Sequence, residues 1–151
     1  MQKLSDRVGT FTDSVIRRMT RINNQYDSIN LSQGFPDFDP PQELLDALAK
    51  TAYQGPHQYA VTFGAQNFRE ALAKKASPML HHEVNPDTEI CVTCGGTEAM
   101  MAAMMTLCNP GDKVMIFSPF YENYGADAIL SGAEPIYIPL VPPEYEFDLS
   151  L

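Results

Sequence analysis

The sequence predicts an α/β fold in which helices pack on a mostly parallel sheet. Its second half alternates short apolar segments of strand type with helical segments, and the connections between them are short. The expected order is a strand at residues 89–94, a helix at 97–108, a strand at 113–117, a helix ending near 130 and a strand at 134–138. Because a helix separates each strand from the next, the strands are expected to run parallel.

Three helices are expected before the sheet. Residues 11–22 predict a short amphipathic helix that docks on a partner surface, with an apolar stripe made of Phe11, Val15, Met19 and Ile22. Asp39, which a proline follows, is a typical N-cap, and Gln42 takes a capping-box position, so a second helix is expected at residues 41–52. The third helix is expected at residues 66–80.

The elements of the second half each have a distinct sequence signal. Residues 89–94 are rich in β-branched and apolar side chains, which predicts a buried strand. The helix at 97–108 is apolar on nearly every side, so we expect a larger body to enclose it. An Asn-Pro-Gly-Asp turn ends this helix, and Gly132 is expected to end the helix that runs to residue 130.

Composition excludes several classes of protein. The 151 residues include 10 Lys and Arg against 19 Asp and Glu, which gives a formal net charge of −9. Such a chain is not expected to bind nucleic acid or an anionic membrane surface. The longest apolar run, residues 99–105, is far shorter than the roughly 20 residues of a membrane span. The 3 cysteines and an N-terminus without a signal-peptide pattern predict a cytoplasmic protein.

The segment that turns through Gly95 and Gly96 into a helix is the sharpest local signal of a binding site. The first-turn amides of a helix lack internal acceptors and carry the positive end of the helix dipole. The glycines let a ligand approach the backbone and Thr97 adds a hydroxyl donor, so this segment could bind a phosphate or a carboxylate. A tight turn in which Thr97 simply caps the helix would have the same sequence, and no lysine follows as in a Walker A loop.

Two other segments are candidate ligand contacts. The aromatic segment 118–124 begins where a strand ends, and ligands of open α/β sheets bind at the carboxyl ends of strands. One of its three aromatics could stack on the ring of a ligand whose phosphate lies at Thr97, and the other two are expected in a core or an interface. Gly34, in a proline-rich turn, offers a backbone amide, although ordinary turn chemistry also explains this turn.

No metal site is expected. Cys91 and Cys94 are three positions apart on a predicted strand, so their sulfur atoms would face opposite sides. No second Cys pair and no matched His pair completes a ligand set. The methionines of the helix at 97–108 are interpreted as core residues.

Five blocks of the sequence resemble the fold-type I, class I/II aminotransferases that depend on pyridoxal 5'-phosphate. The resemblance is to the branch that contains the kynurenine, methionine and aspartate aminotransferases, and the blocks follow the family's order and spacing. They are residues 29–38 (INLSQGFPDF), 58–64 (QYAVTFG), 92–99 (VTCGGTEA), 109–114 (NPGDKV) and 118–124 (SPFYENY). The resemblance implies a three-layer α-β-α fold, present here as an incomplete large domain with a mostly parallel sheet.

The resemblance also implies which residues bind the cofactor. Gly95, Gly96 and Thr97 would hold the phosphate of pyridoxal 5'-phosphate. Tyr121 would stack on the pyridine ring. Tyr59 would reach across a homodimer interface to the cofactor phosphate of the other subunit.

For the substrate, the resemblance implies that Gly34 donates its amide to the α-carboxylate and that Asn123 and Tyr124 line the site. The family's Schiff-base lysine, which also moves the proton, is expected beyond the end of the chain. None of the lysines present, Lys3, Lys50, Lys74, Lys75 and Lys113, occupies that position. The chain is expected to cover about the first two-fifths of such an enzyme and to be inactive alone.

The function that the resemblance implies is transfer of an amino group from an L-amino acid to a 2-oxo acid. Residues 1–45 would form the N-terminal arm and the start of the small domain, and residues 46–151 the truncated start of the large cofactor-binding domain. Two alternatives remain open. One is a pyridoxal-phosphate-dependent carbon–sulfur β-lyase of the same fold, and the other is a non-catalytic module that binds a phosphate ligand or a partner.

Overall fold

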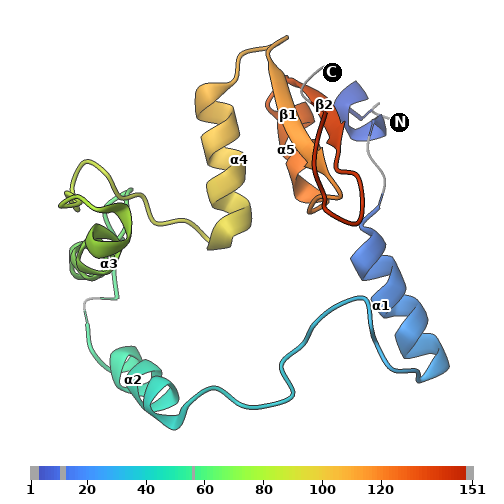
Figure 1. Ribbon diagram of the computed structural model, residues 1–151. Helices are drawn as coiled ribbons and strands as arrows, with labels where there is room; N and C mark the ends of the chain where they lie inside the picture. Colours follow the sequence, from blue (N-terminus) through green and yellow to red (C-terminus); the bar gives the residue numbers. More distant parts are fainter. Residues whose placement is uncertain (1–3, 11–12, 56, 149–151) are drawn as a thin grey trace. The chain divides into compact units, whose positions relative to one another are not determined.

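The computed structural model describes residues 4–10, 13–55 and 57–148. Figure 1 shows the elements in chain order: the 3-10 helix η1 (Asp6–Gly9), α1 (Val15–Tyr26), α2 (Gln42–Ala52), α3 (Gln66–Leu80), α4 (Gly95–Leu107), β1 (Lys113–Ser118), α5 (Asn123–Leu130) and β2 (Glu134–Pro139). They fall into two compact units. The sheet unit takes in the described residues up to Val15 and those from Thr93 onwards, and the helical unit runs from Ile16 to Val92.

The sheet unit contains a parallel pair of strands. β1 and β2 pair in register from Lys113 opposite Glu134 to Ser118 opposite Pro139. α5 is the crossover between them and contacts both strands as well as α4. Ile116 on β1 and Ala128 on α5 are buried where these elements meet. The parallel βαβ arrangement predicted for residues 113–138 is therefore confirmed.

Residues 89–94 were predicted as a strand, and this prediction is wrong for the described structure. These residues form no strand, and the Val92 amide donates a hydrogen bond to the Phe63 carbonyl at 2.9 Å. A strand is defined by a ladder of backbone hydrogen bonds, which an apolar sequence alone does not supply. Cys91 and Cys94 are both exposed.

Several helix starts also differ from the predicted ones. α1 begins at Val15 rather than at residue 11, and Phe11 lies outside the described residues. The N-cap of α2 is Pro41 rather than Asp39, and the Gln42 side chain bonds to Asp46 instead of closing a capping box. Polar side chains near a helix start can form several alternative hydrogen bonds. The sequence therefore predicts that a helix forms more accurately than it predicts the residue at which the helix begins.

The helical unit is organised around Arg69. Arg69 is 6% exposed, and its guanidinium donates to the Gly64 carbonyl at 3.0 Å, to the Pro86 carbonyl and to the Asp87 carboxylate at 2.7 Å. The donors of one side chain on α3 thereby fix both the loop before this helix and the turn after it. α3 itself has the bounds that the sequence predicts.

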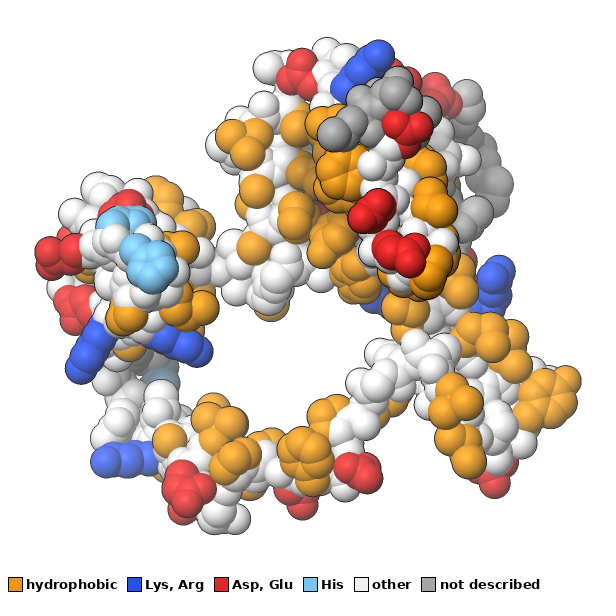
Figure 2. All heavy atoms as spheres, viewed as in Figure 1, with side chains coloured by type: hydrophobic (Ala, Val, Ile, Leu, Met, Phe, Trp, Pro, Cys, Tyr) orange, Lys and Arg blue, Asp and Glu red, His pale blue; other side chains and the backbone are white. Residues whose placement is uncertain are grey.

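Many apolar side chains remain at the surface. Figure 2 shows hydrophobic side chains exposed along α1 and α2. α4 contains no buried residue, and Leu107 is 77% exposed. Among the described residues, no helix is both long enough and apolar enough to cross a membrane.

Candidate cofactor site

The candidate phosphate site is the N-terminus of α4. Cys94 is its N-cap, so Gly95 and Gly96 are the first two residues of the helix and Thr97 is the third. This corrects the view of Thr97 as a possible N-cap. The amides of this first turn have no preceding turn of helix to supply acceptors, and the helix dipole adds partial positive charge.

The backbone is open beside the Cα atoms of the two glycines. Gly95 has a φ of +80°, a left-handed conformation that favours glycine, and a Cβ built on either Gly95 or Gly96 would meet no heavy atom within 4 Å. A phosphate group needs this close approach to backbone N–H groups. The observed geometry therefore fits the phosphate of a cofactor.

Glu98 contributes a negative charge at the same helix end. Its carboxylate accepts a hydrogen bond from the Cys94 amide, which the turn would otherwise leave without an acceptor. The Gly95 amide donates to the Thr93 carbonyl at 2.9 Å. Neither contact uses the amides of Gly96 and Thr97, which are the donors expected to bind phosphate.

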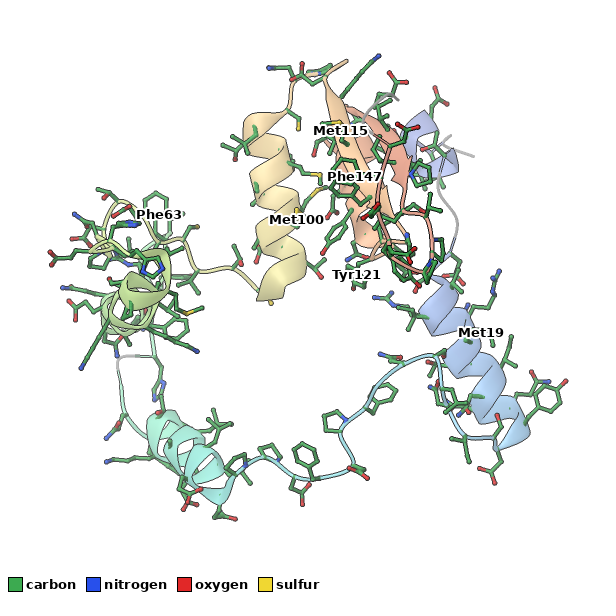
Figure 3. The ribbon with its side chains drawn as sticks, in the orientation of Figure 1. Met19, Phe63, Met100, Met115, Tyr121 and Phe147 are labelled. Atoms are coloured by element: carbon green, nitrogen blue, oxygen red, sulfur yellow. The ribbon has the colours of Figure 1, made fainter. Side chains whose placement is uncertain are left out.

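The aromatic loop after β1 separates its three rings into two packing groups. Phe120 stacks on Tyr137 of β2, with ring centroids 5.0 Å apart and planes at 13°. Tyr121 instead meets Tyr124 edge to face, with centroids 5.8 Å apart, and is 48% exposed. Figure 3 labels Tyr121 beyond the end of β1. Phe120 therefore packs within the sheet unit, and Tyr121 keeps exposed ring surface that a ligand could cover.

A side-chain contact joins the start of α5, which follows the aromatic loop, to the phosphate site. The Asn123 side-chain amide lies 3.4 Å from the Thr97 hydroxyl, to which it donates. The start of α4 and the end of β1 lie at the same end of the sheet unit (Figure 1). Gly95, Gly96, Thr97, Tyr121 and Tyr124 all belong to the sheet unit, and the Asn123–Thr97 contact links the start of α4 to the segment that carries the two tyrosines.

The other two predicted site residues belong to the helical unit. Gly34 is exposed in a turn where the Asn30 side chain accepts hydrogen bonds from the backbone amides of Ser32 and Gln33. Tyr59 is fully exposed, at 101%. Gly34 and Tyr59 therefore both present accessible groups.

The sequence reasoning missed Glu122, which lies between Tyr121 and Asn123. Its carboxylate accepts hydrogen bonds from the Ser14 hydroxyl and, at 3.1 Å, from the Val15 amide. Glu122 is the N-cap residue of α5, a position from which a side chain usually bonds to its own helix. The sequence gives no signal for a partner more than one hundred positions away. Among the residues that the structure describes, no three His, Cys, Asp or Glu side chains gather to hold a metal ion.

Comparison with known proteins identifies the family. A family model described as aminotransferase class I and II matches residues 26–150. The methionine aminotransferase of Escherichia coli K12 is 40% identical over 135 residues, which are 89% of this chain and 35% of that protein. The kynurenine–oxoglutarate transaminase of Dictyostelium discoideum is 34% identical over 139 residues, covering 91% of this chain and 32% of the relative.

Solved structures agree with the sequence comparison. The crystal structure of YbdL from Escherichia coli, for which a methionine aminotransferase function was identified, has a TM-score of 0.88 at 36% identity. The match covers 98% of this chain and 39% of YbdL. The fold is that of the fold-type I aminotransferases, as predicted. The chain belongs to the class I and II aminotransferase family and spans about a third of the length of the curated relatives it matches.

Proposed function

We propose that this chain supplies the phosphate-binding and ring-binding half of the active site of an aminotransferase that uses pyridoxal 5'-phosphate. The enzyme would transfer an amino group from an L-amino acid to a 2-oxo acid. The observation that carries the proposal is the hydrogen bond between Asn123 and Thr97, which joins a helix N-terminus to the loop that carries an exposed Tyr121 ring. Family membership and the generally pyridoxal-phosphate-dependent chemistry of this family support the same assignment.

Each candidate site residue of the sheet unit has a distinct role in this proposal. The amides of Gly96 and Thr97, with the Thr97 hydroxyl, bind the phosphate and so fix one end of the cofactor. Tyr121 covers one face of the ring, and Tyr124 limits its rotation through their edge-to-face contact. When bound, pyridoxal phosphate acts as an electron sink that stabilises negative charge at the substrate Cα.

The remaining assignments rest on family resemblance and on exposure. Gly34 donates its amide to the substrate carboxylate, and Tyr59 binds the cofactor phosphate of the other subunit in a homodimer. Residues 1–45 belong to the N-terminal arm and the start of the small domain, and residues 46–151 to the start of the large domain. The protein acts in the cytoplasm on amino-acid and 2-oxo-acid substrates.

Replacing Thr97 tests the phosphate site directly. Thr97→Val keeps the shape of the side chain but removes the hydroxyl, so the dissociation constant of pyridoxal phosphate is expected to rise about tenfold or more. Thr106→Val on the same helix is the matched control, because the Thr106 hydroxyl bonds to the Ala102 carbonyl at the other end of α4. Spectroscopic titration of the protein at its natural length measures both constants, and equal constants for the two variants would refute the phosphate site.

A panel of L-amino acids and 2-oxo acids tests the reaction itself. The natural-length protein, loaded with pyridoxal phosphate, is expected to form a new amino acid from the added 2-oxo acid. Mass spectrometry of the products gives the substrate pair. Release of pyruvate from a sulfur amino acid without any amino acceptor would instead assign a β-lyase.

A further inference from the structure

Glu122 makes an unusual contact for an N-cap residue. It stands at the N-cap of α5, yet its carboxylate makes no capping bond to that helix. The same carboxylate accepts hydrogen bonds from the Ser14 hydroxyl and the Val15 amide, where α1 begins. All three residues belong to the sheet unit.

The start of α1 carries positive side chains that a carboxylate can offset. No acidic residue lies in its first turn, whereas Arg17 and Arg18 follow Val15 by two and three positions. Positive side chains near a helix N-terminus are repelled by the positive end of the helix dipole. A carboxylate at that end interacts favourably with the dipole and with the two arginines. Glu122 also supplies an acceptor to the Val15 amide, which is one of the first-turn donors that α1 cannot satisfy internally.

Glu122 also lies between two residues of the candidate cofactor site. Tyr121 precedes it, and Asn123, which follows it, donates to the Thr97 hydroxyl. The backbone here is a tight turn, closed by the bond from the Tyr124 amide to the Tyr121 carbonyl at 3.1 Å. A fixed Glu122 side chain therefore restricts the conformations of both neighbours: Tyr121, which is assigned to the cofactor ring, and Asn123, which donates to Thr97.

From these contacts we propose that Glu122 is a positioning residue that couples the start of α1 to the cofactor site. Its carboxylate caps α1 and, by the same bonds, holds the Tyr121–Asn123 turn in the conformation that receives the cofactor. The coupling to the cofactor rests on the proposed function, but the capping of α1 does not. Because coupling between two sites is reciprocal, cofactor binding must also stabilise the start of α1.

Limited proteolysis measures the capping of α1 in the protein at its natural length. Trypsin cleaves after Arg17 and Arg18, and cleavage requires the first turns of α1 to open. Glu122→Ala is expected to speed cleavage at these two bonds about fivefold or more, and Glu122→Gln, which keeps an acceptor but loses the charge, by less. Glu144→Gln, an exposed glutamate of the same unit, is the matched control and is expected to change nothing.

Two further measurements separate a positioning role from a general loss of structure. Glu122→Ala is expected to raise the dissociation constant of pyridoxal phosphate about three- to tenfold, and added cofactor is expected to slow cleavage at Arg17 in the unmodified protein but not in this variant. Ser14→Ala is expected to speed cleavage alone and to add nothing in the Glu122→Ala background.

Each outcome decides one part of the proposal. Unchanged cleavage in Glu122→Ala would refute the capping of α1. Faster cleavage with an unchanged dissociation constant would refute the coupling to the cofactor. If the unmodified protein binds no pyridoxal phosphate, the proposed function fails and so does the coupling, while the cleavage rates still decide whether Glu122 caps α1.

Discussion

Asp127 is a buried carboxylate that lacks compensation for its burial. It lies on α5 and is 6% exposed, and one of its carboxylate oxygens has no hydrogen-bond partner among the described residues. Desolvation by burial raises the pKa of Asp127 above its ordinary value. Asp127 is not part of the candidate site. We therefore expect burial of its carboxylate to lower the stability of the fold without serving the site.

Replacing Asp127 by asparagine is therefore expected to stabilise the protein at neutral pH. With a raised pKa, the folded state holds its proton to higher pH than the unfolded state, so the free energy of unfolding falls as pH rises through the folded-state pKa. Asp127→Asn cannot ionise and should remove this decline, raising the free energy of unfolding at neutral pH by about 1 kcal/mol.

Urea unfolding at a series of pH values measures the effect of Asp127→Asn. The two proteins should differ least at acid pH, where Asp127 is protonated in both states, and most above the folded-state pKa. Asp37→Asn, at an exposed position, is the control and should leave the stability unchanged. A variant that is less stable than the unmodified protein at neutral pH would show that the carboxylate has a favourable partner.

Among the secondary-structure elements, α3 depends most on one side chain. Removing the Arg69 guanidinium leaves the carbonyls of Gly64 and Pro86 without their donor. Arg69→Ala is expected to lower the free energy of unfolding by about 2–4 kcal/mol, because a buried side chain and the hydrogen bonds to two half-buried carbonyls are lost together. Asp87→Asn is the informative comparison, since its side chain is 72% exposed and an exposed ion pair contributes less than about 1 kcal/mol.

Hydrogen exchange locates the effect of Arg69→Ala within the element. The Gly64 amide donates to Val61 and the Val92 amide donates to Phe63, so both report on the loop that Arg69 fixes. Faster exchange at these amides in Arg69→Ala, but not in Asp87→Asn, is the expected pattern. Equal effects in the two variants would mean that the ion pair, rather than the carbonyl contacts, stabilises the loop.

Prediction from sequence succeeded where periodicity and turn residues define an element locally. α3 and the strands β1 and β2 follow apolar patterns, and a polar turn after α3 and a proline at the end of each strand mark where they stop, so their positions were predictable within about a residue. The strand predicted at 89–94 failed because strand formation depends on a neighbour and not on the segment alone.

The candidate site was predictable for the same local reason, and only in part. A glycine pair at the start of a helix is visible in sequence, and so is an aromatic segment after a strand. The roles of Arg69 and Glu122 could not be predicted, because Arg69 bonds to the Pro86 carbonyl 17 positions away and Glu122 accepts from Ser14 and Val15, more than one hundred positions away. An arginine on an amphipathic helix is ordinarily expected at the surface, whereas here folding of the chain buries it among carbonyls.

At the scale of the whole molecule, exposed apolar surface is the main property of this chain. α4 is apolar on nearly all sides, yet Met105 and Leu107 are 62% and 77% exposed. A helix with no polar face is normally enclosed by other protein. The chain matches only 35% of the methionine aminotransferase of Escherichia coli, so that relative has much further sequence with which to cover the corresponding helix.

The 151-residue chain alone is therefore predicted not to transfer amino groups, although it is predicted to recognise the cofactor phosphate. Catalysis in this family requires a lysine that attaches the cofactor and moves the substrate proton. Of the five lysines, Lys50, Lys74, Lys75 and Lys113 are exposed on α2, on α3 and at the start of β1, and Lys3 lies outside the described residues.

The measurement compares the 151-residue chain with the methionine aminotransferase of Escherichia coli K12 as a positive control, each mixed with pyridoxal phosphate, an L-amino acid and a 2-oxo acid. The short chain should give no product above the rate of free pyridoxal phosphate, because a phosphate site alone binds the cofactor but supplies no group to move the proton at Cα. Borohydride reduction followed by peptide mapping should find no stoichiometric cofactor adduct on any of its lysines. A specific adduct with turnover would mean that one of these exposed lysines moves into the site, and would overturn this prediction.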